Sequence, residues 1–346
     1  NKVNKNLLGF KVLGTRYDIP KIVKEKNVGI MFLAIDNISS KSRKKIIEIC
    51  QTTGVKTRVL PSTVEMIKKG GIMNNLRDVE IEDLLGRDTI KLDNQNISEL
   101  IENKTVLVTG GAKGIGEAIS KEFARASYNV CINYNSSENE ARKLKELLIN
   151  EGCNVEIFKA NVSNRKNVDE MVDFCIKRFD SLDILINNAG ICEYKPFCDI
   201  QNEEIEKMIS INVVGTFNTT QSALNNYMLR KHSGTIINIS SIWGIVGASC
   251  EVNYSMSKAA IIGMSKALAK ELGPSNIRVN VIAPGIIDTS MIKNLTDSDI
   301  ENIKYEIPLE KIGSVKDVSK LALFLASEDA SYITGQVISP NGGWFM

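Results

Sequence analysis

The chain is poor in the residues on which several common kinds of site depend. Its 346 residues include one histidine, His232, and seven cysteines without a Cys-x-x-Cys pair. An odd number of such thiols predicts reduced cysteines in a cytosolic setting rather than disulfides or a zinc site. His232 lies in Lys-His-Ser-Gly, a surface turn before an expected strand, which argues against a mechanism based on histidine. We therefore expect no resident metal.

Long apolar runs and an excess of charge are also missing. No apolar segment approaches the ~20 residues that span a bilayer, and no signal peptide begins the chain. A formal net charge of +2 is too near balance to favour nucleic acid. With 43% hydrophobic and 24% charged residues, the composition is that of a globular chain of one to three domains. We expect a cytoplasmic protein without a membrane span or a nucleic-acid partner.

A glycine-rich loop is the first positive signal. Residues 105–109 have the pattern of a buried strand, which runs directly into Gly-Gly-Ala-Lys-Gly-Ile-Gly at 110–116 and then into an apolar helix pattern. Strand, glycine turn and helix in this order favour dinucleotide binding. Gly110 permits the tight turn, Gly114 lets the backbone approach a pyrophosphate, and Gly116 allows close packing of the helix. The phosphates are expected at the helix N-terminus.

Tyr254 and Lys258 form the second signal. Their spacing of four residues places a phenol and an ammonium group on one face of a helix. A tyrosine titrates near ~10, and a cation within about 4–6 Å lowers that pKa toward the range useful for acid–base chemistry. The same spacing is also common on solvated helix faces, so the pair gains weight only from its context.

Residues 104–346, which contain this pair and the glycine loop, resemble the short-chain dehydrogenase/reductase family. The motifs occur in the order that the family has: the glycine loop with three residues between its first two glycines, Asn187-Asn188-Ala189-Gly190, Asn212, Ser241, Tyr254 with Lys258, and Pro284-Gly285. The resemblance implies an α/β fold with a Rossmann-type, doubly wound parallel sheet. It also implies a homotetramer, the usual assembly of the family.

The resemblance implies roles for four residues. Tyr254 would donate a proton to the oxygen of a ketone that is reduced by hydride transfer. Lys258 would lower the pKa of Tyr254 and hydrogen-bond the nicotinamide ribose. Ser241 would orient the carbonyl through its hydroxyl, with Ser240 as the competing candidate, and Asn212 would hold a water that relays protons toward Lys258. The alternative for Asn212 is a helix asparagine that satisfies backbone groups.

The resemblance also implies a nicotinamide cofactor, and the sequence favours NADP(H) over NAD(H). The second strand, 129–134, is followed by Asn135 rather than by an acidic residue that would repel a 2′-phosphate, and Lys113 adds positive charge to the glycine loop. The alternative for Lys113 is a solvated loop lysine. The remaining expected cofactor contacts are Gly110, Gly114, Ile115, Gly116, Asn161, Val162, Asn188, Gly190, Ile287 and the catalytic pair itself.

Within this family the chain is most similar to 3-oxoacyl-[acyl-carrier-protein] reductases, in the sequence at 280–289 and in Thr-Gly-Gln-Val-Ile at 334–338. The substrate would then be a 3-oxoacyl thioester of fatty acid biosynthesis. Sugar, steroid and polyol dehydrogenases share these motifs, and the segment 286–306, which usually covers the substrate in this family, has no sequence pattern that identifies one. Two alternatives stay open: a nucleotide-sugar reductase or 4,6-dehydratase, and a nucleotide-sensing module without enzymatic activity.

The first hundred residues have a different pattern. We expect strands at 11–13, 29–35 and 56–60 and helices at 19–26 and 39–53, an alternation typical of parallel βα units but without a glycine-rich nucleotide loop. Together with the sequences at 13–20, 59–61 and 77–87, this segment resembles the region before the catalytic domain of nucleotide-sugar 4,6-dehydratases of capsular polysaccharide synthesis.

Two resemblances in one chain predict a composite protein. They overlap within residues 105–112, a strand and turn that both families share, which indicates a fusion or recombination of two genes or an assembly artefact. We therefore expect a partial α/β segment at 1–96, a linker at 97–103, and a short-chain dehydrogenase/reductase domain at 104–346. The reductase domain is expected to fold without the preceding segment.

Overall fold

A computed structural model describes residues 6–7, 10–33, 40–59, 77–78, 104–289 and 296–346. The chain separates into two units, residues 1–93 and 94–346. The expected linker at 97–103 lies outside the described residues, so the expected domain boundaries stay a prediction. Within the described part of the chain, no helix has both the length and the apolar character that crossing a membrane requires.

A sheet of seven parallel strands forms the centre of the second unit. Its strands are β6 (Thr105–Val108), β7 (Asn129–Tyr134), β8 (Val155–Lys159), β9 (Ile184–Asn187), β10 (Gly234–Ile239), β11 (Ile277–Ile282) and β12 (Val337–Ile338). They lie in the order β12-β11-β10-β9-β6-β7-β8, and each neighbouring pair is parallel. The order reverses between β6 and β9, and such a point in a doubly wound sheet opens a crevice at the carboxyl ends of the strands. The expected fold class is confirmed.

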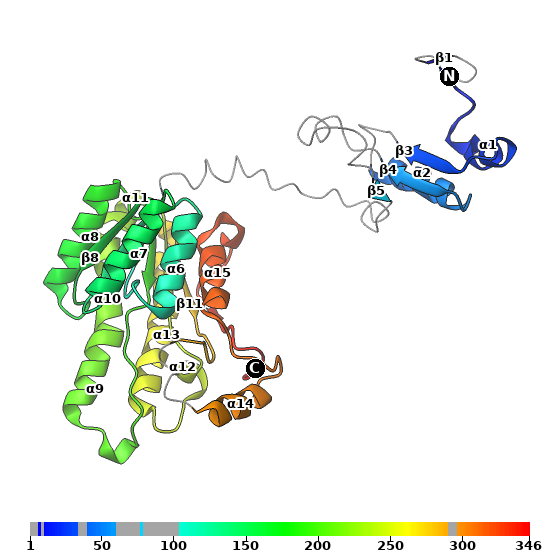
Figure 1. Cartoon of the computed structure of the whole chain (residues 1–346). Coiled ribbons are helices and arrows are strands. Elements are labelled where there is room, and N and C mark those ends of the chain that lie inside the picture. Colours follow the sequence, from blue (N-terminus) through cyan, green and yellow to red (C-terminus); the bar gives the residue numbers. More distant parts are fainter. Residues whose placement is uncertain (1–5, 8–9, 34–39, 60–76, 79–103, 290–295) are drawn as a thin grey trace. The chain divides into compact units, whose positions relative to one another are not determined.

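Helices cover both faces of this sheet (Figure 1). One face carries α6 (Gly114–Arg125), α7 (Glu138–Asn150) and α15 (Val315–Ala326). The other carries α8 (Arg165–Phe179), α10 (Gly215–Ala223) continued by the π-helical turn η5 (Leu224–Met228), and α13 (Val252–Leu272). The remaining helices are α9 (Asn202–Ile209), the π-helical turn η4 (Ser210–Val214), α11 (Leu229–Lys231), α12 (Trp243–Val246) and α14 (Asp297–Glu306), with short 3₁₀ turns at Phe197–Asp199, Gly273–Ser275 and Glu328–Ala330.

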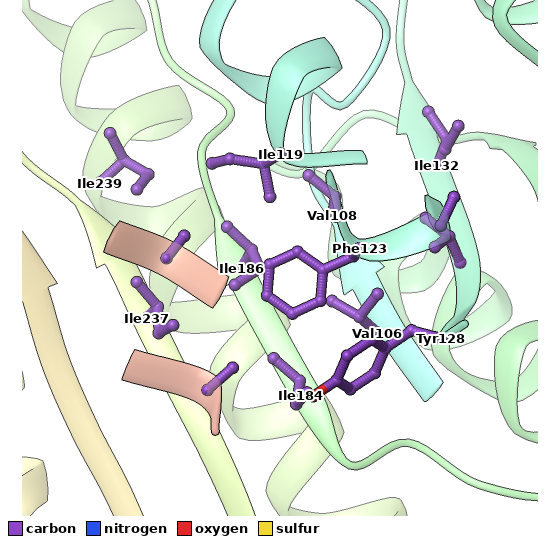
Figure 2. Packing of buried hydrophobic residues seen from close by; sticks show 14 of the residues in the cluster. Val106, Val108, Ile119, Phe123, Tyr128, Ile132, Ile184, Ile186, Ile237 and Ile239 are labelled. Atoms are coloured by element: carbon purple, nitrogen blue, oxygen red, sulfur yellow. The ribbon is translucent and has the colours of Figure 1, made fainter. Parts of the chain in front are cut away.

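The alternation of side chains along the strands divides the core into two layers. Figure 2 shows the layer around Phe123 of α6, where Val106 and Val108 of β6 and Ile184 and Ile186 of β9 face the helix. The residues between them, such as Leu107 and Leu185, lie in the opposite layer under α8. Because side chains of a strand alternate between faces, a continuous apolar run is what a sheet covered on both faces requires.

The first unit is a small α/β arrangement of its own. β3 (Ile30–Leu33) and β4 (Lys56–Val59) are parallel and are connected through α2 (Ser40–Gln51), as expected, and α1 (Ile19–Glu25) also agrees. Ile47 and Cys50 of α2 pack with Leu33 in its buried cluster.

Two features of the first unit correct the sequence-based expectation. The strand expected at 11–13 is instead β2 (Phe10–Lys11), which forms an antiparallel pair with β1 (Asn6–Leu7). β5 (Arg77–Asp78) also pairs antiparallel, with β4, so the unit is not built of parallel βα units alone. Short strands of two residues carry little periodicity, which is why pattern reasoning placed β2 at 11–13 and missed β1 and β5.

Deletion of residues 1–103 should leave the second unit folded, because its two large hydrophobic clusters draw only on residues after 104. We expect the melting temperature of the shortened protein to stay within about 4 °C of the full chain, a shift that corresponds to roughly 1 kcal/mol in a domain of this size. Differential scanning calorimetry of both proteins measures this. A larger fall, or loss of activity, would mean that the first unit is integral to the second.

Candidate active site

The glycine loop forms a tight turn that excludes side chains. Gly110 has φ +60°, in the left-handed region that favours glycine. A Cβ on Gly116 would lie 2.3 Å from the Gly110 carbonyl oxygen and 2.5 Å from Asn188 Nδ2. The first turn of α6 is therefore pressed against the end of β6, as the spacing of the glycines predicts.

The space beside the loop fits a pyrophosphate. Gly114 has φ +54° and begins α6, and a Cβ there would meet nothing nearer than Thr289 Cγ2 at 3.7 Å. The first N–H groups of a helix have no acceptor within it, so they are available to an anion. Ile115 packs against the core beside them. Free backbone donors and a left-handed glycine at one point, where a Cβ would make only ordinary contacts, suit the phosphates of a dinucleotide.

Asn133 supports this loop, a role that the sequence did not reveal. Its side chain is buried at the end of β7, where its Oδ1 accepts a hydrogen bond from Gly110 N at 3.2 Å. Its Nδ2 donates to Ala160 O at 3.0 Å, beyond β8. One amide thus connects the loop to two neighbouring strands.

Asn188 and Gly190 lie beside the glycine loop and the predicted catalytic pair. Asn188 Nδ2 donates to the carbonyl oxygens of Thr109 and Gly110, each at 3.1 Å. A Cβ on Gly190 would lie 3.2 Å from Asn212 Oδ1 and 3.5 Å from Lys258 Nζ. The segment after β9 therefore runs between the glycine loop and the predicted catalytic residues.

The rim expected to hold the adenine half of a cofactor is more exposed. Asn135 is exposed just after β7. Asn161 Oδ1 accepts hydrogen bonds from Ser163 N and Oγ at 3.1 and 2.7 Å, while Val162 is buried. Lys113, at the N-cap of α6, forms an ion pair with Glu140 of α7 at 2.9 Å. The expected positive charge of the loop is therefore paired with a carboxylate.

Tyr254 and Lys258 lie together on the buried side of α13, with Ser241 beside them. The Tyr254 side chain is hydrogen-bonded to Ser241, which follows β10. Lys258 Nζ lies 5.6 Å from the centre of the Tyr254 ring and donates to Ile239 O at 2.8 Å. Ser240 Oγ donates to Lys258 O at 2.8 Å, so the competing hydroxyl has a structural partner.

The pKa values of this pair differ from the expectation. Burial raises the pKa of Tyr254 above its ordinary value, the neighbouring Cys192 and Glu251 add to the rise, and the hydrogen bond from Ser241 opposes it. Burial also lowers the pKa of Lys258 to about 8, against a smaller opposite effect of Cys192. The expectation of a Tyr254 pKa below its ordinary value is thus wrong here, because burial dominates the shift. The phenol stays protonated at neutral pH.

Asn212 is fully buried in the π-helical turn η4, where a helix widens by one residue. Its Oδ1 accepts from Ile191 N at 2.8 Å, and its Nδ2 donates to Ile191 O at 2.9 Å and to Ser257 Oγ at 3.0 Å. Ser257 Oγ in turn donates to Tyr254 O at 2.8 Å. The Asn212 side chain therefore holds the segment after β9 against α13, which agrees with the backbone-satisfying alternative. Ser257 was not found from the sequence.

Ile287 completes the set of predicted contacts. It is buried, forms a bridge with Gly313, and packs in the core near the end of β11. Within the described ranges, no three histidine, cysteine or acidic side chains gather as a metal site would require. The structure therefore brings Asn212, Ser241, Tyr254, Lys258, Asn188 and Gly190 to one end of the sheet, with the glycine loop beside them.

Comparison with known proteins identified relatives of this chain. The profile of a family described as Enoyl-(Acyl carrier protein) reductase matches residues 110–345. An uncharacterized oxidoreductase of Bacillus subtilis, YmfI, is 40% identical over 243 residues, which are 70% of this chain and 99% of the relative. The 3-oxoacyl-[acyl-carrier-protein] reductase FabG of Staphylococcus aureus is also 40% identical over 243 residues, 70% of this chain and 98% of the relative.

A solved structure extends the likeness to three dimensions. A mutant short-chain dehydrogenase/reductase from Serratia marcescens matches with a TM-score of 0.66 and 29% sequence identity. The match covers 70% of this chain and 98% of that protein.

Proposed function

Because the chain belongs to the short-chain dehydrogenase/reductase family of oxidoreductases, we propose that it reduces a ketone to a secondary alcohol with Tyr254 as the proton donor. The observation that carries this proposal is the buried, hydrogen-bonded pair of hydroxyls on Ser241 and Tyr254, with Lys258 below the tyrosine ring. Two hydroxyls that meet at one point suit a single carbonyl oxygen. The complete set of four residues argues against a nucleotide-sensing module without activity.

The chemistry follows from the protonation states. The nicotinamide, when bound, supplies the hydride. Ser241 orients the carbonyl oxygen, and Tyr254 Oη donates the proton that this oxygen needs as it becomes a hydroxyl. Because burial keeps Tyr254 protonated, the acid is present at neutral pH. Lys258 provides the nearby cation that stabilises the tyrosinate left after the transfer.

We propose NADP(H) as the cofactor, since no acidic residue follows β7 directly and Lys113 lies in the glycine loop. The glycine loop, Asn161 and Val162, Asn188, Gly190, Ile287 and the catalytic pair would hold it. Asn135 and Lys113 would lie near the 2′-phosphate. The Lys113–Glu140 ion pair means that a phosphate competes with Glu140 for the lysine.

Variants of this ion pair should change cofactor preference in opposite directions. Lys113→Ala removes the cation and should lower the ratio of kcat/KM for NADPH to that for NADH by about tenfold. Glu140→Gln releases the lysine and should raise the ratio by about threefold. Initial rates with both cofactors at a fixed ketone concentration measure the effect.

Lys166→Ala is the matched control, because Lys166 is also an exposed lysine paired with a glutamate, on α8. Its ratio should equal that of the parent. If Lys113→Ala leaves this ratio within twofold of the parent value, Lys113 does not contribute to a preference for NADP(H).

The proposed substrate is a 3-oxoacyl thioester, as in fatty acid biosynthesis. The 40% identity to a reductase of that name supports it. The family profile bears the name of an enoyl reductase, so an unsaturated thioester belongs among the test substrates. Assays of NADPH oxidation with acetoacetyl and crotonyl thioesters and with a UDP-4-keto-sugar, together with mass spectrometry for loss of water from UDP-sugars, would separate these reactions. We expect turnover of the acetoacetyl thioester; turnover only of UDP-sugars or of the crotonyl thioester would overturn this choice.

A nucleotide-sugar reductase or 4,6-dehydratase remains the second candidate, on the resemblance of residues 1–112 alone. A homotetramer in the cytoplasm, acting on carrier-bound ketones, is part of the leading proposal. Size-exclusion chromatography with light scattering tests the assembly.

A further inference from the structure

Two loops leave the candidate active site side by side and carry Cys192 and Glu251. Glu251 immediately precedes α13, three residues before Tyr254. Cys192 follows Ile191, whose backbone is held by Asn212. A backbone hydrogen bond joins the two loops, from Lys195 N to Cys250 O at 2.7 Å. Both side chains are therefore attached to segments that the active-site residues fix.

A thiol and a carboxylate meet between these loops. Cys192 Sγ donates to Glu251 Oε2 at 3.1 Å, and both side chains are only partly exposed. Burial raises the pKa of Cys192 to about 12, and the neighbouring Glu251 adds to the rise, so the sulfur keeps its proton and remains a donor. Burial raises the pKa of Glu251, and the hydrogen bond from the neutral thiol opposes that rise and so stabilises the carboxylate.

Helix capping does not account for the position of Glu251. It occupies the N-cap of α13, yet its side chain makes no hydrogen bond to the first turn. The carboxylate turns instead toward Cys192 and lies near the tyrosine. After burial and Cys192, the Glu251 charge contributes to the raised pKa of Tyr254.

We propose that Glu251, held by Cys192, is a charge filter that admits neutral 3-oxo esters and thioesters and rejects free 3-oxo acids. This inference rests on the proposed ketone reduction. A free 3-oxo acid carries its carboxylate two carbons from the reacting carbonyl, so that a second negative charge must enter beside Glu251. Repulsion between such charges is strong where solvent is partly excluded. Among the described residues, Lys258 forms no ion pair with Glu251; its ammonium donates to Ile239 O and lies 5.6 Å from the centre of the Tyr254 ring.

The test compares methyl acetoacetate with acetoacetate, which differ by one methyl group and one charge. The parent should show a higher kcat/KM for the ester. Glu251→Gln keeps the shape of the side chain and removes its charge, and it should reduce the ester-to-acid ratio by about tenfold, mainly through faster turnover of the acid. Turnover of the ester itself should stay within about threefold of the parent.

Three further variants test whether the effect depends on the charge of Glu251 in particular. Glu193→Gln removes an exposed charge from the same loop and should leave the ratio unchanged. Glu251→Asp keeps the charge and should keep the discrimination, which also covers the case in which Glu251→Gln folds poorly. Cys192→Ser retains a donor and should stay within about threefold of the parent ratio. Melting curves of all variants check folding.

The outcomes separate this inference from the proposed function. If the parent reduces the ester and Glu251→Gln leaves the ratio within twofold, the filter is wrong while ketone reduction stands. An equal effect of Glu193→Gln would also overturn it, because a general change in charge would then suffice. If the parent reduces neither the esters nor the thioesters, the proposed function itself fails and the filter with it.

Discussion

Tyr254→Phe should lower kcat for ketone reduction by about 10²–10⁴-fold, the usual contribution of a positioned general acid. The substitution keeps the buried ring that packs over Lys258 and removes only the hydroxyl. Binding of NADPH should change little, because the ring remains in place. Rates of NADPH oxidation with an acetoacetyl thioester give kcat, and fluorescence titration gives the cofactor affinity.

Tyr332→Phe serves as the control, since Tyr332 is fully exposed and its hydroxyl has no place in the site. It should retain the parent rate. Activity of Tyr254→Phe within about tenfold of the parent, less than ~1.4 kcal/mol of barrier, would contradict the role of this hydroxyl. Loss of cofactor affinity to the same extent would point to a structural role instead.

The elements that the sequence predicted correctly are those with a strong local pattern. The strand at 105–109 and the glycine spacing of 110–116 follow from a short stretch of chain, and the structure has β6 and the start of α6 there. The spacing of Tyr254 and Lys258 also places both on one face of α13, since neighbours on a helix are three or four residues apart.

The features that the sequence did not reveal depend on contacts between distant segments. Asn133 reaches Gly110 from 23 residues away, and Cys192 reaches Glu251 across 59 residues. No periodicity marks such pairs. The pKa of Tyr254 shows the same limit, because spacing alone indicated a cation nearby, whereas burial by the whole fold sets the direction of the shift.

The position of Asn212 in the chain could be predicted from the sequence, but the local geometry around it could not. The sequence located it in the predicted catalytic set, and in the structure it lies within hydrogen-bonding distance of Ile191 and Ser257. Its widened helical turn could not be predicted, because π-helical turns are rare and depend on the packing around them. The side chain connects the segment after β9 to α13. Because its Oδ1 and Nδ2 already bind protein groups, other atoms would have to hold a catalytic water.

Gly116→Ala should abolish tight cofactor binding, with Kd for NADPH raised by at least about 100-fold. A methyl group there would lie 2.3 Å from the Gly110 carbonyl oxygen, which belongs to the backbone and cannot rotate away. The first turn of α6 must then move from β6, and the phosphate-binding N–H groups move with it. Overpacking of this kind also costs about 1–3 kcal/mol of stability. Titration of NADPH fluorescence and thermal melting measure the two effects separately.

Gly263→Ala is the matched control for that substitution. Gly263 is exposed inside α13, and a Cβ there would meet nothing within 4 Å. It should bind NADPH as the parent does and gain up to about 1 kcal/mol, because alanine restricts the unfolded chain more than glycine. If Gly116→Ala bound NADPH within about threefold of the parent, the close approach of α6 to β6 would not be required. The dinucleotide would then have to bind by contacts other than this loop.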